Sequence, residues 1–299
     1  MSDRSGLLVV DKPGGWTSHQ VVGRIRRLAG TRRVGHAGTL DPMATGVLVV
    51  GVNRATRLLG HLALHDKRYQ ATIRIGQATV TDDAEGEVVA APGAAGIGLE
   101  QVRSAATRLT GEIWQVPSAV SAIKVDGRRS YARVRAGEQV ELPARQVNVT
   151  RLTIDAARAT TATDGAAVLD LDVDVECSSG TYVRALARDL GRLLGSAGHL
   201  SALRRTRVGP FTLDQPHLAS DLERLPDEAW LSLAAAGRLC FPVVEVDADQ
   251  LRDLAYGRPL SAPVDTLTAA IGPHETLAGL YGPDGGRPVA VLQSPGEKR

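Results

Sequence analysis

A single carboxylate stands out in the sequence because of the residues around it. The stretch RVGHAGTLDPMATGVLVVG, residues 33–51, contains one acid, Asp41, which follows His36 and precedes a proline and an apolar run. Asp41 is the only acid between Asp11 and Asp66. Nearby cations favour the charged form of a carboxyl group. An ionised and positioned carboxylate is the group that covalent catalysis or general-base chemistry requires.

The same residue has a structural interpretation. Aspartate followed by proline is typical of a helix N-cap with proline at the first helical position, or of the start of a turn. From these local features alone, Asp41 is predicted to cap a helix or begin a turn, and catalysis is the alternative.

Composition limits the class of protein. The chain has 299 residues, of which 43% are hydrophobic, enough for one large domain or one medium domain with a small appendage. Cys177 and Cys240 lie far apart, so a zinc ribbon or a redox pair is not supported. No run approaches the ~20 apolar residues of a membrane helix, and the apolar stretch near the N-terminus is too short for a signal peptide. We expect a soluble, reduced, cytoplasmic protein.

The distribution of charge is more informative than the net charge of +2. Arginines gather in three clusters, at residues 24–33, 128–135 and 204–207. Guanidinium groups bind phosphate oxygens and stack on bases. One such cluster is often a solvated patch, but three with few local acids favour a nucleic-acid partner.

The sequence motifs of several other enzyme classes are absent. The sequence contains no GxxxxGK[ST], GxSxG or HExxH pattern. His61 and His65 are spaced as neighbours on a helix but lack an acid at the right offset, so a solvent-facing pair is favoured over a metal site. We expect no metal and no nucleotide cofactor.

Hydrophobic periodicity predicts an α+β fold with a largely antiparallel sheet, since strands and helices mix without regular βαβ spacing. Ser18 is the expected cap of the first helix, Ser178 or Ser179 the expected cap of a later one, and Gly30 the expected end of the first. From Val243 a short helix and short strands predict a small β module. The predicted strands are residues 6–10, 47–52, 67–76, 168–177 and 201–211; the predicted helices are 19–28, 53–65, 99–109, 130–136 and 178–195; the predicted loop is 82–97, and 214–240 is predicted to be a helical link.

GHAGTLDPMATGVLVV resembles the catalytic motif of the TruB family of bacterial tRNA pseudouridine-55 synthases. The resemblance extends over almost the whole chain, through DKPGGWTSH, DKRYQATIRIGQATVTDDAEG, QVPSAVSAIKVDGRRSYARVRAGE, CSSGTYVRALARDLG and HLSALRRTRVGPF. The chain departs from the family at Ser118 and Val120, where a second proline and an aromatic residue are frequent. The C-terminal 57 residues resemble the family's PUA-type module only weakly.

The resemblance implies a role for each of three residues. Asp41 takes the place of the essential aspartate in a reaction that breaks the C1′–N1 bond of uridine, turns the uracil over and forms a C5–C1′ bond. The carboxylate attacks the sugar, attacks C6 of the base or assists an elimination, and the sequence does not distinguish these routes. Tyr69 is expected under the extruded base, and Arg184 is expected to pair with the catalytic carboxylate. The family needs no cofactor or metal.

Further residues are implied to bind substrate. His36 matches the histidine at the extruded nucleotide, Leu203 packs near the base, and Tyr182 shares the site only if the helix begins after it. Lys12, with Pro13, matches a motif that supports the catalytic loop at the substrate site. Three residues of the basic stretches are expected to hold RNA: Lys124, Arg129 and Arg205.

The resemblance implies an α+β pseudouridine synthase catalytic domain over residues 1–242, with a central mixed, largely antiparallel sheet and a thumb loop near 124–146. A PUA-like RNA-binding β domain is expected over 243–299. The expected partner is the T stem-loop of tRNA, bound by a monomer without a membrane or an obligate protein partner. Two alternatives stay open: an RNA-binding folding chaperone for tRNA, and a guide-RNA-dependent synthase related to dyskerin.

Overall fold

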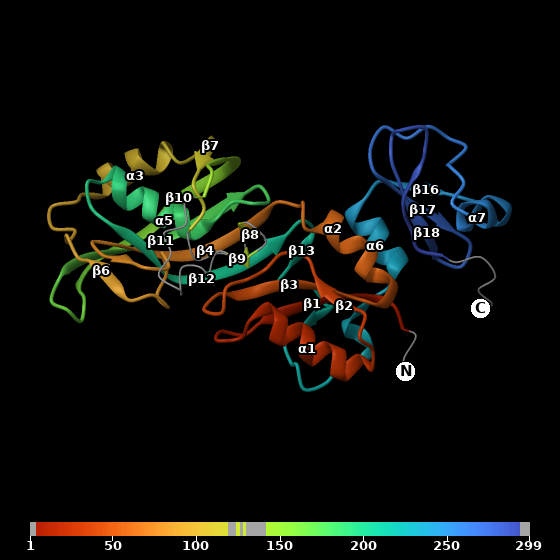
Figure 1. Ribbon diagram of the computed structural model, residues 1–299, viewed down its shortest axis with the longest axis horizontal. Helices are drawn as coiled ribbons and strands as arrows, with labels where there is room; N and C mark the ends of the chain where they lie inside the picture. Colours follow the sequence, from red (N-terminus) through yellow and green to blue (C-terminus); the bar gives the residue numbers. More distant parts are fainter. Residues whose placement is uncertain (1–3, 119–123, 126–127, 130–141, 294–299) are drawn as a thin grey trace. The chain divides into compact units, whose positions relative to one another are not determined.

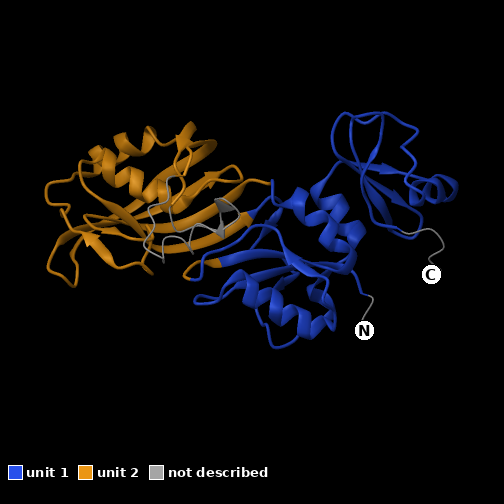
Figure 2. Ribbon diagram, viewed as in Figure 1, with its two compact units in different colours: residues 1–42, 46–64, 208–299 blue, residues 43–45, 65–207 orange. Residues whose placement is uncertain are grey.

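The computed structural model describes residues 4–118, 124–125, 128–129 and 142–293. The chain divides into two compact units (Figure 2). Unit 1 contains residues 1–42, 46–64 and 208–299, and unit 2 contains residues 43–45 and 65–207. Figure 1 gives the element labels. No helix in the described ranges is long and apolar enough to cross a membrane.

The sheet of unit 1 is built on two buried strands. β1 (Gly6–Lys12) pairs antiparallel with β3 (Thr45–Val52) along its whole length. Both are apolar on both faces, which is why they occur as continuous hydrophobic runs in the sequence. Shorter strands complete this sheet: β2 (Val34–His36) is antiparallel to β3, β14 (Leu218–Ala219) is parallel to β1, and β15 (Trp230–Leu231) is antiparallel to β1.

Helix α1 (Ser18–Ala29) connects β1 to β2 and has strong signals at both ends. Thr17 is its N-cap and forms a capping box with Gln20, and Gly30 ends it with a left-handed φ of 62°. The predicted cap Ser18 is therefore wrong by one residue. Its hydroxyl is buried, where it donates to the carbonyl of Leu40 at 3.1 Å and accepts from the Leu40 N–H at 2.9 Å.

The remaining elements of unit 1 are short. Of the predicted helix 53–65, the structure contains the 3₁₀ helix η1 (Asn53–Leu58) and the short α2 (Leu59–Leu62). The helix ends before Leu64, whose side chain is exposed instead of packing on the core. The predicted helical link 214–240 is also wrong over most of its length. Pro216 and Pro226 cannot donate backbone hydrogen bonds, and the chain there pairs with β1 instead. The short elements of this region are β13 (Phe211–Thr212), η2 (Asp227–Ala229) and α6 (Leu233–Cys240).

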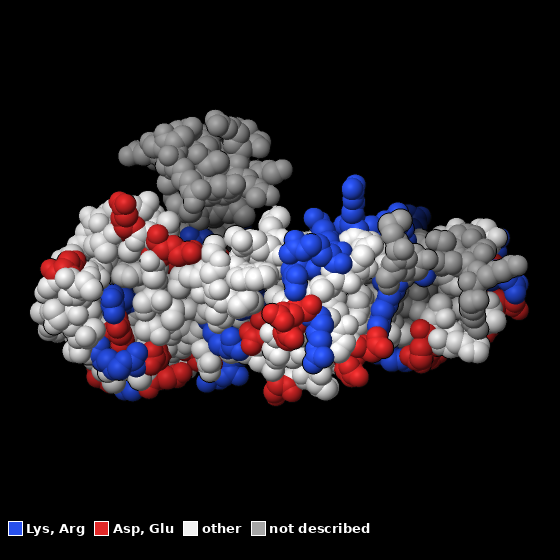
Figure 3. Space-filling view, turned by 90° about the horizontal axis from the view of Figure 1, so that it is seen from below, with Lys and Arg blue, Asp and Glu red and all other residues white. Residues whose placement is uncertain are grey.

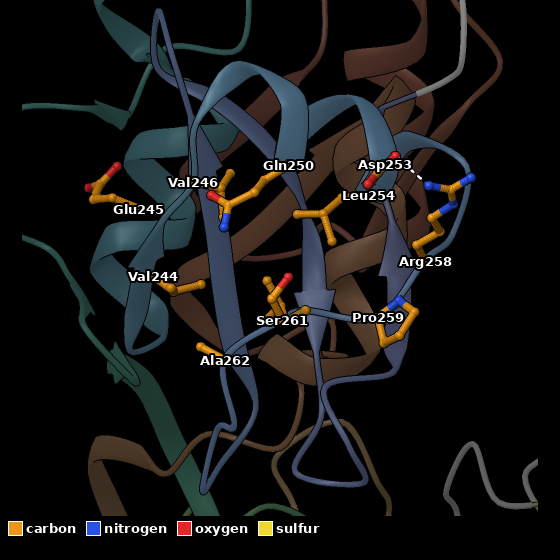
Figure 4. A pocket seen from close by; sticks show the side chains of 11 residues that line it. Val244, Glu245, Val246, Gln250, Asp253, Leu254, Arg258, Pro259, Ser261 and Ala262 are labelled. Atoms are coloured by element: carbon orange, nitrogen blue, oxygen red, sulfur yellow. Dashed lines mark hydrogen bonds and ion pairs between the residues drawn. The ribbon is translucent and has the colours of Figure 1, made fainter.

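The C-terminal part of unit 1 is the predicted small β module. Its sheet has the order β16-β17-β18-β19 and packs against α7 (Ala248–Ala255). Its strands are β16 (Val243–Glu245), β17 (Thr268–Gly272), β18 (Thr276–Tyr281) and β19 (Pro288–Val291). A pocket of about 410 Å³ opens between α7 and residues 258–262, beside the ion pair of Asp253 with Arg258 (Figure 4).

Unit 2 has a sheet of long strands in the order β12-β4-β11-β10-β7, with antiparallel pairing from β4 through β7. The strict alternation predicted for residues 168–177 is confirmed: alternate residues of β11 are buried, and its acids lie on the other face. The strands are β4 (Lys67–Ile75), β7 (Gly111–Gln115), β10 (Arg145–Thr161), β11 (Ala167–Cys177) and β12 (Gly198–Val208). The α+β prediction with a mixed, largely antiparallel sheet is confirmed.

Helices α3 (Leu99–Thr107) and α5 (Val183–Leu193) contact each other, α3 packing on β10 and α5 on β4. The predicted loop 82–97 is interrupted by β6 (Val88–Ala90), which pairs with β5 (Ala78–Thr79). A two-stranded sheet is formed by β8 (Lys124–Val125) and β9 (Arg128–Arg129). The predicted helix 130–136 and most of the thumb loop lie outside the described residues.

One buried polar group predicts a change in stability. Tyr281 is fully buried in the core of the C-terminal module, and its hydroxyl has no hydrogen-bond partner in the described part of the chain. Burial raises the pKa of this hydroxyl to about 12. An unsatisfied buried polar group costs about 1–3 kcal/mol, so Tyr281→Phe should raise the free energy of unfolding by about 1 kcal/mol in urea titrations. Tyr256→Phe, at a side chain that is 67% exposed, is the matched control and should change nothing. A loss of stability in Tyr281→Phe would contradict this assignment.

Candidate active site

Asp41 lies in the loop between β2 and β3 of unit 1, and it is half-buried. No helix follows it: residues 41–44 are a bend that leads directly into β3. The interpretation of Asp41 as a helix cap is therefore wrong, because the chain after Pro42 enters a buried strand instead of an amphipathic helix. Three residues, 42–44, separate the aspartate from Thr45, the first residue of β3.

The buried ammonium of Lys12 holds the loop that carries Asp41 through hydrogen bonds. Lys12 is fully buried, and its Nζ donates to the carbonyls of Pro13 at 2.9 Å, Trp16 at 2.6 Å and Pro42 at 3.2 Å. The N–H of Gly15 adds a hydrogen bond of 2.8 Å to the same Pro42 carbonyl. The turn before α1 and the residue after Asp41 are thus tied to one charge, which suits the supporting role predicted for Lys12.

His36, the last residue of β2, lies on the other side of the same loop. Its ring meets the ring of His19 edge-on, with centroids 5.8 Å apart and an interplanar angle of 80°. His19 comes from the first turn of α1 and is exposed. Unit 1 therefore brings together three of the predicted site residues: Lys12, His36 and Asp41.

Arg184 is placed in unit 2 by the first turn of α5. It is 5% exposed, and its Nη1 lies 3.4 Å from the carboxylate of Asp83 and 2.9 Å from the carbonyl of Thr81. Asp83 is equally buried and also accepts from the N–H of Glu85 at 3.0 Å. Asp83 was not predicted as a site residue, although the motif TVTDDAEG places two adjacent acids before a glycine in a loop of unit 2.

The neighbouring acid, Asp82, also pairs with an arginine of α5. Its φ of 59° is left-handed, and Arg188, one turn further along α5, contacts it at 3.3 Å. Burial raises the pKa of Asp82, and the charge of Arg188 opposes that rise. Arg188 also donates to the Val116 carbonyl at 2.7 Å. Two arginines of one helix therefore hold the loop 81–83.

Tyr69 lies on the buried face of β4, as the alternation predicts, and is 7% exposed. Lys67, two residues earlier on the same face, is similarly buried. Burial and the charge of Arg205 lower the pKa of Lys67 to about 8. Arg205 was expected in a surface cluster but is 1% exposed, so it differs from a solvated arginine, and its role in binding RNA stays a prediction.

Tyr182 precedes the helix, as its predicted role requires. It is the N-cap of α5 in an extended conformation, so Ser178 and Ser179 are not the cap. Its N–H donates to Gln115 Oε1 at 2.8 Å, and its carbonyl accepts from Gln115 Nε2 at 3.1 Å. The guanidinium of Arg145 lies 5.7 Å from the centre of its ring.

The other predicted residues of unit 2 are Leu203, buried on β12, and Lys124 and Arg129, which are register partners in β8–β9. Asp41 belongs to unit 1, whereas Tyr69 and Arg184 belong to unit 2. The pairing of Asp41 with Arg184 and the substrate contacts stay predictions.

The buried pair of Arg184 with Asp83 predicts a large effect on stability. Removing one partner of a buried ion pair costs about 3–5 kcal/mol, because the other charge is left uncompensated. Asp83→Asn should therefore lower the free energy of unfolding by about 3 kcal/mol, measured with urea. Glu100→Gln is the control, since the Arg103–Glu100 pair is exposed and worth less than about 1 kcal/mol. Equal losses in the two variants would show that the buried pair has no special weight.

The chain resembles known proteins over nearly its whole length. Residues 26–183 match the family model of the TruB family pseudouridylate synthase N-terminal domain, and residues 184–255 match the tRNA pseudouridylate synthase B C-terminal domain. The chain is 56% identical to tRNA pseudouridine synthase B of Arthrobacter sp. (strain FB24) over 98% of its length and 94% of the relative. It is 58% identical to the protein of that name from Cutibacterium acnes (strain DSM 16379 / KPA171202), over 94% of each chain.

Two solved structures have the same fold. The Cbf5-Nop10-Gar1 complex contains a chain that matches with a TM-score of 0.68 at 24% identity, over 93% of this chain and 78% of that one. An H/ACA RNP bound to a substrate RNA containing 2′-deoxyuridine matches with a TM-score of 0.67 at 22% identity, over 97% and 84%. The family models and the full-length relatives agree with the six sequence motifs, and the chain belongs to the TruB family of pseudouridylate synthases.

Proposed function

We propose that this protein converts uridine 55 in the TΨC loop of tRNA to pseudouridine, with Asp41 as the catalytic carboxylate. The observation that carries the proposal is the near full-length identity of 56% to a tRNA pseudouridine synthase B, together with the match of the motif around Asp41. The way Lys12 and Ser18 hold the backbone on both sides of Asp41 supports a fixed carboxylate. Catalytic groups require such fixed positions.

The reaction conserves all the atoms of the nucleotide. The N1–C1′ bond breaks, a C5–C1′ bond forms, C5 loses its hydrogen as a proton, and N1 gains one. Asp41 serves as the carboxylate of one of three routes: attack at C1′, attack at C6, or assistance to elimination. Tyr69 provides an aromatic surface for the base and a hydroxyl that can accept the C5 proton when it is ionised. Arg184 holds the charge of Asp41.

A uridine within a stacked RNA loop must leave the stack to reach a carboxylate, at a cost of a few kcal/mol. We propose that His36 fills the space left in the RNA and that Tyr182 and Leu203 contact the extruded base. The ring of His36 meets the ring of His19 edge-on. Lys124, Arg129 and Arg205 are proposed to contribute to the electrostatic field that binds RNA. Residues 1–242 would form the catalytic domain and 243–299 a PUA-like RNA-binding module.

The first experiment uses the proton that C5 loses. Purified protein is incubated with tRNA transcript that carries tritium at C5 of uridine, and tritium release is measured while pseudouridine is mapped in the product. We expect release of one tritium per tRNA, with pseudouridine at position 55. Activity on bare transcript would also exclude a required guide RNA, whereas product at other positions only would contradict the assignment of the substrate.

Asp41→Asn should lower the rate of tritium release by about 10³-fold or more, since positioned acid–base groups contribute about 10²–10⁴-fold. The Kd for tRNA should stay within about threefold of the wild-type value, because this substitution leaves the contacts of the basic residues with phosphate intact. Asp66→Asn, at the next acid along the chain, is exposed and serves as the matched control. Near-normal turnover in Asp41→Asn would refute the catalytic assignment.

Arg184→Lys tests the partner of the carboxylate. A lysine keeps the charge but lacks the planar fork that can bind two carboxylates at once. We expect kcat to fall and the acidic limb of the pH–rate profile to move to higher pH, since the catalytic carboxylate is then less well held in its ionised form. A lower kcat with an unchanged pH profile would assign Arg184 to the Asp83 loop alone.

A second function is supported by one feature, the exposed arginines at the end of α1 and in the segment after it. Arg27, Arg32 and Arg33 are exposed and have no acidic partner among the described residues. A basic surface of this kind could assist tRNA refolding without chemistry. Refolding of misfolded tRNA by Asp41→Asn at the wild-type rate would support this role, and loss of the effect would contradict it.

A further inference from the structure

A narrow groove runs along one side of α1 in unit 1. It has a volume of about 240 Å³ and is lined by Trp16, Gln20, Gly23 and Arg27. These residues are spaced by four, three and four positions, so they follow one stripe of the helix and the turn before it. The volume is below the roughly 300–1,000 Å³ of pockets for drug-sized ligands, so the groove suits a single flat ring.

One of the lining residues, Gly23, is a glycine that the fold of the chain does not require. Gly23 lies inside α1, where glycine is less stable than alanine. A Cβ at this position would meet no atom within 4 Å, so neither packing nor a left-handed backbone explains the glycine. A bare backbone in a helix interior permits close approach by another molecule.

Two of the lining residues are held by hydrogen bonds. The carbonyl of Trp16 is fixed by Lys12 Nζ at 2.6 Å. Gln20 Oε1 accepts from the Thr17 N–H at 2.7 Å and from the Thr17 hydroxyl at 3.0 Å, which sets the side-chain rotamer. Gln20 Nε2 makes no hydrogen bond within the described ranges, and so it presents a donor pair to a ligand.

Arg27 closes the far end with an available charge. Its side chain is exposed and makes no ion pair or hydrogen bond in the part of the chain that the structure describes. Its neighbours differ, since Arg24 donates to the Leu222 carbonyl at 2.6 Å and Arg26 to the Val34 carbonyl at 3.0 Å. No acid occurs between Asp11 and Asp41. Figure 3 shows lysine and arginine side chains gathered on part of the face seen from below.

We infer that this groove binds one nucleotide of the RNA substrate other than the uridine that reacts. The base lies against Gly23 and stacks on the indole of Trp16, Gln20 donates to its edge, and Arg27 binds the adjacent phosphate. An aromatic ring combined with arginine is how proteins hold unpaired nucleotides, and the local charge fits RNA better than an apolar peptide. This site rests on the proposed function, because an RNA substrate is what would present the nucleotide.

The test compares three variants with full-length tRNA. Trp16→Ala removes the stacking surface, Gly23→Leu fills the groove while favouring the helix, and Arg27→Gln removes the charge. Each should raise Kd and KM for tRNA by about 10-fold, which is within the range measured for loss of base stacking. The kcat at saturating tRNA should stay within about twofold. Ser104→Leu, which adds a leucine to the exposed face of α3, is the control and should match the wild type.

The salt dependence of Kd distinguishes the phosphate contact of Arg27 from the base contacts of Trp16 and Gly23. Loss of a phosphate contact lowers the slope of log Kd against log salt concentration by about 1. Arg27→Gln should show this decrease, whereas Trp16→Ala and Gly23→Leu should weaken binding at an unchanged slope. Urea unfolding of each variant checks that the fold is kept.

Wild-type affinity in folded Trp16→Ala and Gly23→Leu would overturn the inference, as would a fall in kcat with KM unchanged. A change in oligomeric state in Gly23→Leu would assign the groove to a second copy of this chain and would also overturn it. A failure of the proposed function would give a different result from a failure of this inference. The wild type would then bind tRNA but release no tritium, and the binding differences among the variants would still decide the role of the groove.

Discussion

The arrangement of the candidate site depends on a single buried cation. The ammonium of Lys12 is removed from solvent, which is costly for a charge unless hydrogen bonds replace its hydration. The carbonyls of Pro13, Trp16 and Pro42 provide this replacement. Because they come from the turn before α1 and from the loop of Asp41, the charge is stable only when both segments take these positions. The requirement of Lys12 for acceptors thus fixes the backbone on which Asp41 stands.

Unit 2 uses buried charge in a comparable way. Arg184 and Arg188 project from adjacent turns of α5 to Asp83 and Asp82. A rigid helix is a better support for such groups than a loop, and the loop 81–83 is held by the arginines in turn. Arg184 also donates to the Thr81 carbonyl, so one guanidinium holds both Thr81 and Asp83 to α5. The motif that first suggested a partner for Asp41 is therefore also part of a larger ionic network.

The sequence predicted the long, periodic elements well and the termini of helices less well. β4 and β11 were correct because alternation over nine residues or more allows only one face to be buried. The cap of α5 was wrong because Ser178 and Ser179 are good caps by residue type, while Gly180, with a φ of 85°, turns the chain before the helix begins. Asp41 shows the same limit, since Asp-Pro is a cap signal only if a helix follows. The residues that follow instead belong to a buried strand, which is a property of the whole sheet.

Tertiary structure also decides which arginines remain available for RNA. The sequence contains three basic clusters, but Arg205 is buried and Arg207 is paired with Glu176, so the third cluster is largely engaged by the protein itself. The arginines of β4 are likewise paired with the acids of β11. The first cluster differs, since Arg27, Arg32 and Arg33 remain exposed without acidic partners in the described residues. Counting basic residues cannot separate these cases, because a guanidinium that balances a buried or neighbouring acid adds little to the field that a polyanion experiences.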